Sequence, residues 1–215
     1  MTRPALSRRT ILEAALRFID REGLDALSMR KLGDELGVEA MSLYRYVSKK
    51  SDLLDGIHEI IISQIPAPTL GGQWRMDLRM LGQAFRRVLL AHPRALPLFA
   101  NRPVITTGSL QFVEIVLAMF REAGFDSDQS ISALHTFHHY VVGHCLLHAV
   151  QSAALSLPEL QEHAGDSFPH TARAAAALAE HDPDREFEFG LDVVLKGLEA
   201  MLVRGVAQLI DAVRT

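Results

Sequence analysis

The sequence predicts an all-α protein: a three-helix N-terminal head that carries a helix-turn-helix, on a larger helical body. Three observations predict this fold class. Apolar residues recur at helical spacing along nearly the whole chain. No segment shows the alternation of apolar and polar residues that is typical of a strand. With 215 residues, 48% of them hydrophobic, the chain is long and apolar enough to bury a sizeable core.

The first fifty residues predict three short helices. Apolar residues at helical spacing over 11–19 predict the first. Ser28 is suited to cap a second helix, Met29–Leu36, and Gly37 is suited to end it. A third helix is expected over 40–47, after only a few connecting residues. These three helices form the head, residues 1–50.

The remaining chain, residues 51–215, predicts a helical body that begins with a connecting helix over 51–65. The Pro- and Gly-rich stretch 66–72 is the clearest boundary behind this helix. The segment 109–121 is apolar nearly all round and is therefore expected to be a buried helix. Asp182, followed by proline and a second acid, is expected to cap the last helix. The other helices are expected over 78–89, 128–151 and 184–213, with a short one around the alanine run 174–177.

Charge is distributed unevenly along the chain, whose net charge is −4. Residues 1–51 hold ten Lys or Arg and seven Asp or Glu, about +3, whereas residues 52–215 hold twelve and nineteen, about −7. The net charge alone argues against a nucleic-acid binder. A basic head on an acidic body, however, directs the head toward phosphate.

Other bulk features exclude several classes of protein. No apolar run reaches the roughly 18–20 residues that span a bilayer. The N-terminal stretch MTRPALSRRT leads into an amphipathic segment and not into the apolar core of a signal peptide. The single cysteine, Cys145, excludes an internal disulfide. We therefore expect a cytoplasmic protein without membrane contact.

The most informative segment is 28–50, SMRKLGDELGVEAMSLYRYVSKK, in which two short helices meet at a tight Gly-Val-Glu turn. This arrangement describes a helix-turn-helix. Leu43 and Val47, four residues apart, are expected to face inward. Tyr44 and Arg45 then lie on other faces, where aromatic and hydrogen-bonding side chains can enter a major groove. Spacing alone leaves an ordinary helical hairpin with a solvated face as the alternative.

The run ILEAALRFIDREGLDALSMRKLGDELGVEAMSLYRYVSKKSDLL resembles the DNA-binding domain of the TetR family along its whole length. The shared motifs are the G-x-x-x-x-S before the second helix, the L-G-V turn, the S-L-Y of the third helix and the V-x-x-K-x-x-L-L that follows. The body is similar to the tetracycline-repressor subgroup. Its shared motifs are F-R-R at 85–87, N-R-P at 101–103, E-A-G-F at 122–125 and F-x-x-G-L at 187–191.

The resemblance implies a transcriptional repressor that binds a palindromic operator as a homodimer and is released by a small molecule. It implies no enzyme activity and no cofactor. The DNA contacts carried over residue by residue are Ser28, Arg30, Ala40, Met41, Ser42, Tyr44, Arg45, Tyr46 and Lys50. Tetracycline repressors have Gln-Pro-Thr where this chain has Ala-Met-Ser at 40–42, and Trp-His where it has Arg-Tyr at 45–46. We therefore expect a different base preference.

The resemblance also implies a ligand pocket in the body. Its residues would be Leu81, Phe85, Leu98, Arg102, Pro103, Val113, Val116, Leu117, Ile131, Leu134, His138 and Leu147. The family's magnesium-binding histidine falls on Leu98 and its acidic residue on Leu147, and a leucine offers no oxygen to a hard cation. We therefore expect no metal and a small hydrophobic or aromatic effector, with Arg102 and His138 as polar handles for an acceptor or anionic group on it.

A histidine-rich segment carries the main alternative, a metal- or small-molecule-binding helical protein without operator binding. Histidines four residues apart are a metal-ligand spacing. On a helix, however, the first three lie on one side and the last two near the opposite side, so they cannot converge on one ion. Cys145 lies two turns from His138, too far for a nucleophile–base pair, and is expected to be an isolated buried thiol. The five histidines are His135, His138, His139, His144 and His148.

Dimerisation is expected on two grounds. One helix-turn-helix covers too little DNA for useful specificity, and half-sites usually repeat about one helical turn apart. In addition, the apolar faces of the helices over 128–151 and 184–213 resemble those that form a four-helix bundle between subunits in this family.

Overall fold

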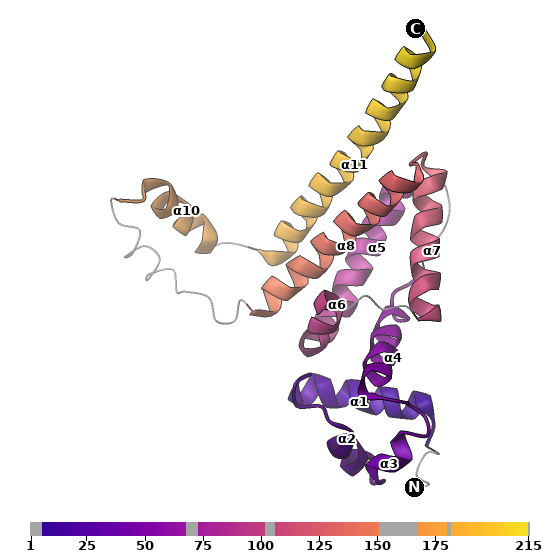
Figure 1. Cartoon of the computed structure of the whole chain (residues 1–215). Helices are drawn as coiled ribbons and strands as arrows, with labels where there is room; N and C mark the ends of the chain where they lie inside the picture. Colours follow the sequence, from indigo (N-terminus) through magenta and orange to yellow (C-terminus); the bar gives the residue numbers. More distant parts are fainter. Residues whose placement is uncertain (1–5, 68–72, 102–105, 151–166, 180–181, 215) are drawn as a thin grey trace.

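The structure is a computed structural model that describes residues 6–67, 73–101, 106–150, 167–179 and 182–214. In these ranges every regular element is a helix, so the predicted all-α class is confirmed. Figure 1 shows the head, α1 to α3, at one end of the molecule and the body at the other, joined by α4. The helices are α1 (Arg8–Glu22), α2 (Met29–Leu36), α3 (Ala40–Leu43), α4 (Lys50–Ile62), α5 (Trp74–Ala91), the short 3₁₀ helix η1 (Pro93–Ala95), α6 (Pro97–Asn101), α7 (Thr107–Glu122), α8 (Ser127–Val150), α10 (Pro169–Ala179) and α11 (Pro183–Arg214).

The head packs around α1, which presents a row of buried apolar residues to α2 and α4. Ser7 caps this helix, because its hydroxyl accepts a hydrogen bond from the Thr10 amide at 3.1 Å. Gly56 on α4 allows the two helices to approach closely, since a Cβ there would lie 2.6 Å from a methyl carbon of Leu12. The helix that leads into the body is therefore packed tightly against the head.

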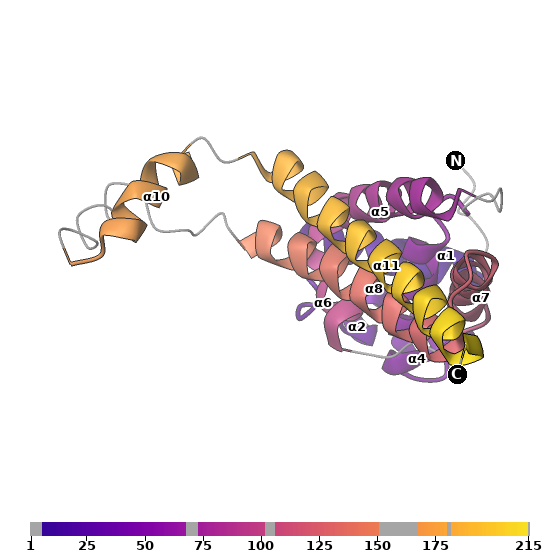
Figure 2. The ribbon, with the colours of Figure 1, turned by 90° about the horizontal axis from the view of Figure 1, so that it is seen from above.

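The body is built from α5, α7, α8 and α11, with α8 packed against α5, α7 and α11 (Figure 2). An ion-pair ladder ties α5 to α11. Arg79 bonds Glu188 at 3.0 Å and Asp192 at 2.7 Å, and Arg75 bonds Glu199 at 2.7 Å. Because higher numbers on α11 pair with lower numbers on α5, the two helices run antiparallel.

The last helix begins as the sequence predicts. The Asp182 carboxylate accepts a hydrogen bond from the Asp184 amide at 2.9 Å, and Pro183 occupies the first helical position. The alanine run predicted to be helical lies within α10. In both views α10 stands apart from the helices of the body (Figures 1 and 2).

Two sequence expectations differ from the structure. The third helix was expected over 40–47, but α3 ends at Leu43 and turns with i to i+3 bonds continue the rotation, one of them from the Tyr46 amide to the Leu43 carbonyl at 2.9 Å. The helix expected to be buried all round, α7, is buried only along one side, and Leu110 is 52% exposed. Its outer apolar side chains have no covering element among the described residues of the single chain.

Within the described residues, no helix combines the length and the apolar character that crossing a bilayer requires.

Candidate DNA-binding head and ligand cavity

The turn between α2 and α3 is set by local backbone chemistry. The Ser28 hydroxyl accepts a hydrogen bond from the Lys31 amide at 3.2 Å and so caps α2. Gly37 has φ 59°, a left-handed conformation that glycine adopts without strain. Gly33 is also required, because a Cβ there would lie 2.7 Å from the carbonyl oxygen of Val38. The two helices can therefore meet at a sharp angle.

The third-helix segment presents one buried and one exposed side. Leu43 and Val47 are completely buried, which confirms the prediction that they face inward. Met41 is 72% exposed, Tyr44 is 42% exposed, and Arg45 is also exposed. The third-helix segment thus exposes a thioether, a phenol and a guanidinium, and is anchored by apolar side chains.

The segment after α3 is held by an ion pair to α1. Arg8 donates to a carboxylate oxygen of Asp52 at 2.8 Å and to the carbonyl of Tyr46 at 3.3 Å. The Ser48 amide donates to the other carboxylate oxygen of Asp52 at 2.9 Å. The Arg8 guanidinium, and then this amide, hold the pKa of Asp52 below its usual value against the opposing effect of burial. These contacts fix where the exposed side of the third helix points.

The nine residues predicted to contact DNA all lie on this part of the head. Six of them are exposed: Arg30, Met41, Tyr44, Arg45, Tyr46 and Lys50. Three are half-buried: Ser28, Ala40 and Ser42. Ser28 also serves as the cap of α2, and its contact with DNA, like that of the other eight, stays a prediction.

The body contains a cavity of about 260 Å³ between α4, α5, α6, α7 and α8. Its lining is mainly aromatic and apolar. The residues are His58, Ile62, Phe85, Phe99, Ser109, Phe112, Val113, Leu134, His135 and His138. Such a lining, with a few polar groups, is typical of a site for a small organic molecule.

Aromatic rings in the cavity wall lie next to one another in a connected row. The His58 ring lies 4.4 Å from the Phe99 ring, and Phe85 lies 6.2 Å from Phe99, 6.4 Å from Phe112 and 5.9 Å from His138, all between ring centroids. The wall is therefore a continuous set of ring edges and faces, which suits a planar guest.

The two inner histidines are neutral at physiological pH. Burial, followed by the nearby His138, lowers the pKa of His58 to about 4. Burial, followed by the neighbouring His139 and His135, lowers the pKa of His138 to about 4. A neutral imidazole offers one donor and one acceptor, so both rings present hydrogen-bonding groups and no charge to the cavity.

The predicted ligand residues divide into several groups. Phe85, Val113, Leu134 and His138 line the cavity. Leu81, Leu98 and Val116 are buried in the core beside it. Arg102 and Pro103 lie outside the described residues. Leu147 is 67% exposed on α8.

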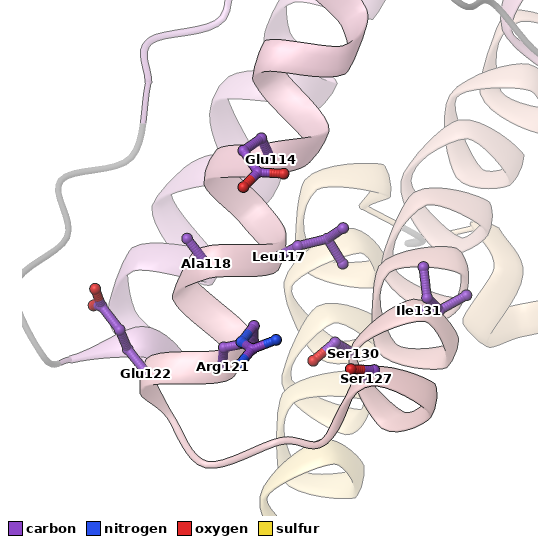
Figure 3. Close-up of a pocket in the computed structure, with 8 residues that line it drawn as sticks. All are labelled: Glu114, Leu117, Ala118, Arg121, Glu122, Ser127, Ser130 and Ile131. Atoms are coloured by element: carbon purple, nitrogen blue, oxygen red, sulfur yellow. The ribbon is translucent and has the colours of Figure 1, made fainter.

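Leu117 and Ile131 lie in a different place, a groove at the end where α7 turns into α8. Figure 3 shows Leu117 projecting from α7 toward α8, where Ile131 lies. The polar Glu114 and Arg121 lie on α7, as Leu117 does. In this single chain the two residues do not reach the cavity that holds His138.

Six lining residues were not among the predicted ligand residues: His58, Ile62, Phe99, Ser109, Phe112 and His135. A signal for His58 was present: it lies on the side of the connecting helix that carries Ile61 and Ile62, in the isoleucine-rich segment GIHEIII. A histidine placed inside an apolar stripe marks a buried polar group.

Several contacts tie the head and the connecting helix to the body, among them a bond from Arg94 of η1 to the Arg21 carbonyl of α1. The His92 ring, at the end of α5, lies 2.9 Å from a carboxylate oxygen of Asp20 on α1. Glu59 on α4 accepts a hydrogen bond from the Gly108 amide at 3.0 Å, at the first turn of α7. Glu59 follows His58 directly, so α4 contacts both the cavity and the start of one of its walls.

The far side of α8 holds His144 and His148, the last two histidines of this helix. The His144 and His148 rings stack at 6.3 Å, and His144 lies 5.1 Å from the Phe187 ring on α11. Cys145 is free and fully buried, which confirms the predicted isolated thiol, and burial raises its pKa to about 11. Among the described residues, no three His, Cys, Asp or Glu side chains are grouped so as to hold a metal ion.

The outer face of α11 carries a stripe of exposed apolar side chains. Phe189 is 73% exposed, and Val193 and Met201 follow it at intervals of one or two turns. Leu147 is exposed on the neighbouring α8. Exposed apolar stripes of this kind on adjacent helices mark a protein–protein contact.

Two family models match the chain. The model described as "Bacterial regulatory proteins, tetR family" matches residues 11–57, and the model described as "Tetracyclin repressor-like, C-terminal domain" matches residues 66–202. The first match covers the head and the start of α4, and the second covers most of the body.

Individual relatives agree with these models. An HTH-type transcriptional regulator of Saccharopolyspora erythraea is 35% identical over 189 residues, 87% of this chain and 74% of that protein. The HTH-type transcriptional repressor DrrR1 of Streptomyces coeruleorubidus is 31% identical over 218 residues, covering 94% of this chain and 80% of DrrR1. The crystal structure of apo ActR from Streptomyces coelicolor superimposes with a TM-score of 0.84 at 27% identity, covering 95% of this chain and 99% of that one.

Proposed function

The chain belongs to the tetR family of bacterial regulatory proteins, and we propose that it is a homodimeric repressor that leaves a palindromic operator when a small molecule enters its body. The observation that carries this proposal is the third-helix segment, where Leu43 and Val47 anchor a surface that exposes Tyr44 and Arg45. Binding to the operator requires the protein to share a compartment with DNA, so we propose a cytoplasmic location.

In this proposal the head reads bases with the exposed side of the third helix and holds phosphates at its flanks. Arg45 is suited to guanine edges, and Met41 to the methyl group of thymine. The Tyr44 hydroxyl reaches a base or the backbone. Lys50, at the start of α4, is placed to hold a phosphate and so to fix the register of the head on the duplex.

Two copies supply the two heads. The exposed stripe of Phe189, Val193 and Met201, with Leu147 beside it, is the face that we propose to form the dimer. A dimer places two recognition segments on half-sites about 34–36 Å apart. The palindromic form of the operator follows from the two-fold symmetry of the protein.

The proposed effector is a small hydrophobic or aromatic molecule that occupies the cavity bounded by Phe85, Phe99 and Phe112. Relatives support an organic effector: ActR has been solved in complex with actinorhodin, and several relatives are named tetracycline repressors. A magnesium–tetracycline chelate fits poorly, because Leu98 stands where the family has its magnesium-binding histidine and Leu147 where it has the acidic residue that orders the magnesium-bound waters. Release follows if the effector binds the non-DNA conformation more tightly than the DNA-bound one.

The proposal is tested by replacing the exposed pair in the head. In the double variant Tyr44→Ala/Arg45→Ala we expect operator binding to fall to the level of nonspecific DNA, with the dimer intact. The measurements are fluorescence anisotropy with DNA from upstream of the protein's own gene, or with a duplex selected from a random pool, and sedimentation velocity for the dimer. The matched control is Arg87→Ala, which removes an exposed arginine from α5.

Three results would contradict the proposal: unchanged affinity in the double variant, a monomeric wild-type protein, or wild-type binding that is insensitive to salt. Specific binding should weaken steeply as salt rises, because each phosphate contact releases counterions. The Arg87→Ala variant should retain both the affinity and the salt dependence of the wild type.

A further inference from the structure

Two histidines on the outer side of α8 face each other across one helical turn. His135 and His139 are both exposed, and their rings stack with centroids 5.8 Å apart and planes inclined by 17°. Residues four apart lie on the same side of a helix, one above the other. The pair therefore presents two imidazoles at the spacing that metal sites on helices use.

The separation of the two rings is close to that of a metal chelate. Zn²⁺ binds imidazole nitrogens at about 2.0–2.1 Å. With a nitrogen about 1 Å from each ring centre, an ion that two imidazoles share at the tetrahedral angle holds the ring centroids about 5 Å apart. The observed 5.8 Å becomes this distance when the two rings tilt slightly toward each other.

Both rings are available to a ligand from solution. Neither His135 nor His139 has a hydrogen-bond partner among the residues that the structure describes. The helix α8 contains no Lys or Arg, so it brings no fixed positive charge that would repel a cation. The part of the chain that carries α8, residues 52–215, holds twelve Lys or Arg and nineteen Asp or Glu, which favours the approach of a cation.

A second histidine pair with the same spacing lies on α8, but its nitrogens are less accessible. The His144 and His148 rings are 6.3 Å apart, and His144 packs against the Phe187 ring at 5.1 Å. One nitrogen of each ring, His144 Nε2 and His148 Nδ1, is buried. The exposed pair is therefore the better chelate for an ion from solution.

We propose that His135 and His139 form a two-histidine clip for a divalent late transition-metal ion, of the class of Zn²⁺, Ni²⁺ and Cu²⁺. Imidazole nitrogen suits these ions, whereas Mg²⁺ and Ca²⁺ prefer oxygen ligands. Water fills the coordination positions that the two histidines leave open. The clip needs neither an operator nor an effector, so it goes beyond the proposed function.

An ion in the clip acts on a turn of α8 that also forms part of the cavity wall. His135 lies in that wall, and so do Leu134 and His138 in the same stretch of helix. An ion that joins residues four apart stabilises the helical turn between them. It also stabilises the folded protein, because the unfolded chain does not hold the two rings at this separation. Zinc should therefore raise the midpoint of thermal unfolding.

Metal binding is measured by titration calorimetry on the full-length protein, without a polyhistidine tag. We expect each chain to bind a single Zn²⁺ ion, Cu²⁺ to bind more tightly than Zn²⁺, and MgCl₂ to give no binding. Thermal unfolding followed by circular dichroism, with and without ZnCl₂, gives the shift of the midpoint.

The variants test whether the exposed pair holds the ion. In His135→Gln and in His139→Gln the affinity for Zn²⁺ should fall by about 10–100-fold or more, because the loss of a ligand costs at least as much as the loss of an outer-shell partner. The zinc-induced rise of the unfolding midpoint should shrink in both. The control His148→Gln alters the second pair, and His170→Gln removes an exposed histidine from α10. Both controls should keep the wild-type affinity.

A measurement on the wild-type protein does not depend on how the variants fold. Adding ZnCl₂ should shift the imidazole NMR resonances of His135 and His139 and leave those of His170 in place. Absence of zinc binding, wild-type affinity in His139→Gln, or an equal loss of affinity in His148→Gln would each overturn the inference. So would one ion per two chains, because the ion would then be shared between two copies.

Discussion

The head and the body of this protein differ in whether their buried polar side-chain atoms have hydrogen-bond partners. In the described part of the head, buried side chains are apolar and polar ones are exposed or bonded, as with Ser28 at the cap of α2 and with Arg8 and Ser48, which donate to Asp52 on α4. The buried side-chain polar atoms that lack a partner lie elsewhere in the described residues. They are His58 Nδ1, Arg86 Nε, His144 Nε2 and His148 Nδ1.

This difference matches the division of work between the two regions. A surface that must fit the fixed geometry of a duplex benefits from a core with one arrangement. A region that responds to a ligand benefits from groups whose energy improves when the ligand arrives. His58 lines the cavity, and it lies on the helix that packs against the head, between Gly56 at the α1 contact and Glu59 at the α7 contact.

The strongest way to test this contrast is to open a cavity in the head. Leu43→Ala removes a completely buried side chain, and we expect the free energy of unfolding to fall by about 2–5 kcal/mol. Operator binding should weaken as well, because the anchor behind Tyr44 and Arg45 is lost. Urea denaturation followed by circular dichroism gives the change. Leu110→Ala on the exposed side of α7 should stay within about 0.5 kcal/mol of the wild type, and a comparable loss there would refute the contrast.

Lowering the pH should cause the next largest loss of stability, and this loss comes from the body. Burial keeps His58 neutral in the folded state until its pKa of about 4, whereas the unfolded chain takes up the proton near pH 6.5. The unfolded state therefore binds more protons in this window, so stability falls as the pH drops from 6.5 to 4. The loss from His58 is on the order of 3 kcal/mol at the acid end.

Carboxylates also titrate near the lower end of this range, so the readout is the difference between the wild type and His58→Phe. The variant should lose less stability than the wild type between pH 6.5 and 4, as measured by urea denaturation at each pH. Parallel curves for the two proteins would show that His58 is solvated or paired, and would remove it from the unsatisfied groups of the body.

A third prediction compares the leucine-to-alanine substitution in the head with the same substitution at the cavity wall. Leu134 is partly buried and already faces empty space. Leu134→Ala should therefore cost about 1 kcal/mol, well below Leu43→Ala, because fewer packing contacts are lost. It should also enlarge the cavity and change the affinity for an aromatic ligand such as 2-naphthol. Equal costs for the two leucines would mean that the wall is packed as tightly as the head.

The sequence also differs between the head and the body in how much of the structure it predicts. The bounds of α2 were predicted correctly from Ser28 and Gly37, because caps and left-handed glycines act within a few residues. The inward side of the third helix was predicted from the spacing of Leu43 and Val47 alone. The early end of α3 was not, since short turns depend on contacts such as Arg8 to the Tyr46 carbonyl, which join distant parts of the chain.

The cavity was predicted only in part, for a physical reason. Periodicity tells which residues face inward, but not where the interior is hollow, because that depends on how several helices meet. The family resemblance identified Phe85 and His138, yet it also gave Leu117, which lies in a separate groove in this chain. His58 was visible as a histidine in an isoleucine-rich segment, and only the packing of α4 against α5, α6 and α7 shows what it faces.

The smallest expected effect concerns the tie between the two regions. Asp20→Asn removes the carboxylate that contacts His92 across the join, and a partly exposed ion pair contributes about 0.2–1 kcal/mol. Stability should therefore change little, but the body should lose part of its hold on the head. We expect the operator affinity without ligand to change less than threefold, and the loss of affinity caused by a saturating aromatic ligand of the cavity, such as 2-naphthol, to shrink. An unchanged response to the ligand would mean that the other contacts between body and head carry the signal, namely those of α4 and the bond from Arg94 to the Arg21 carbonyl.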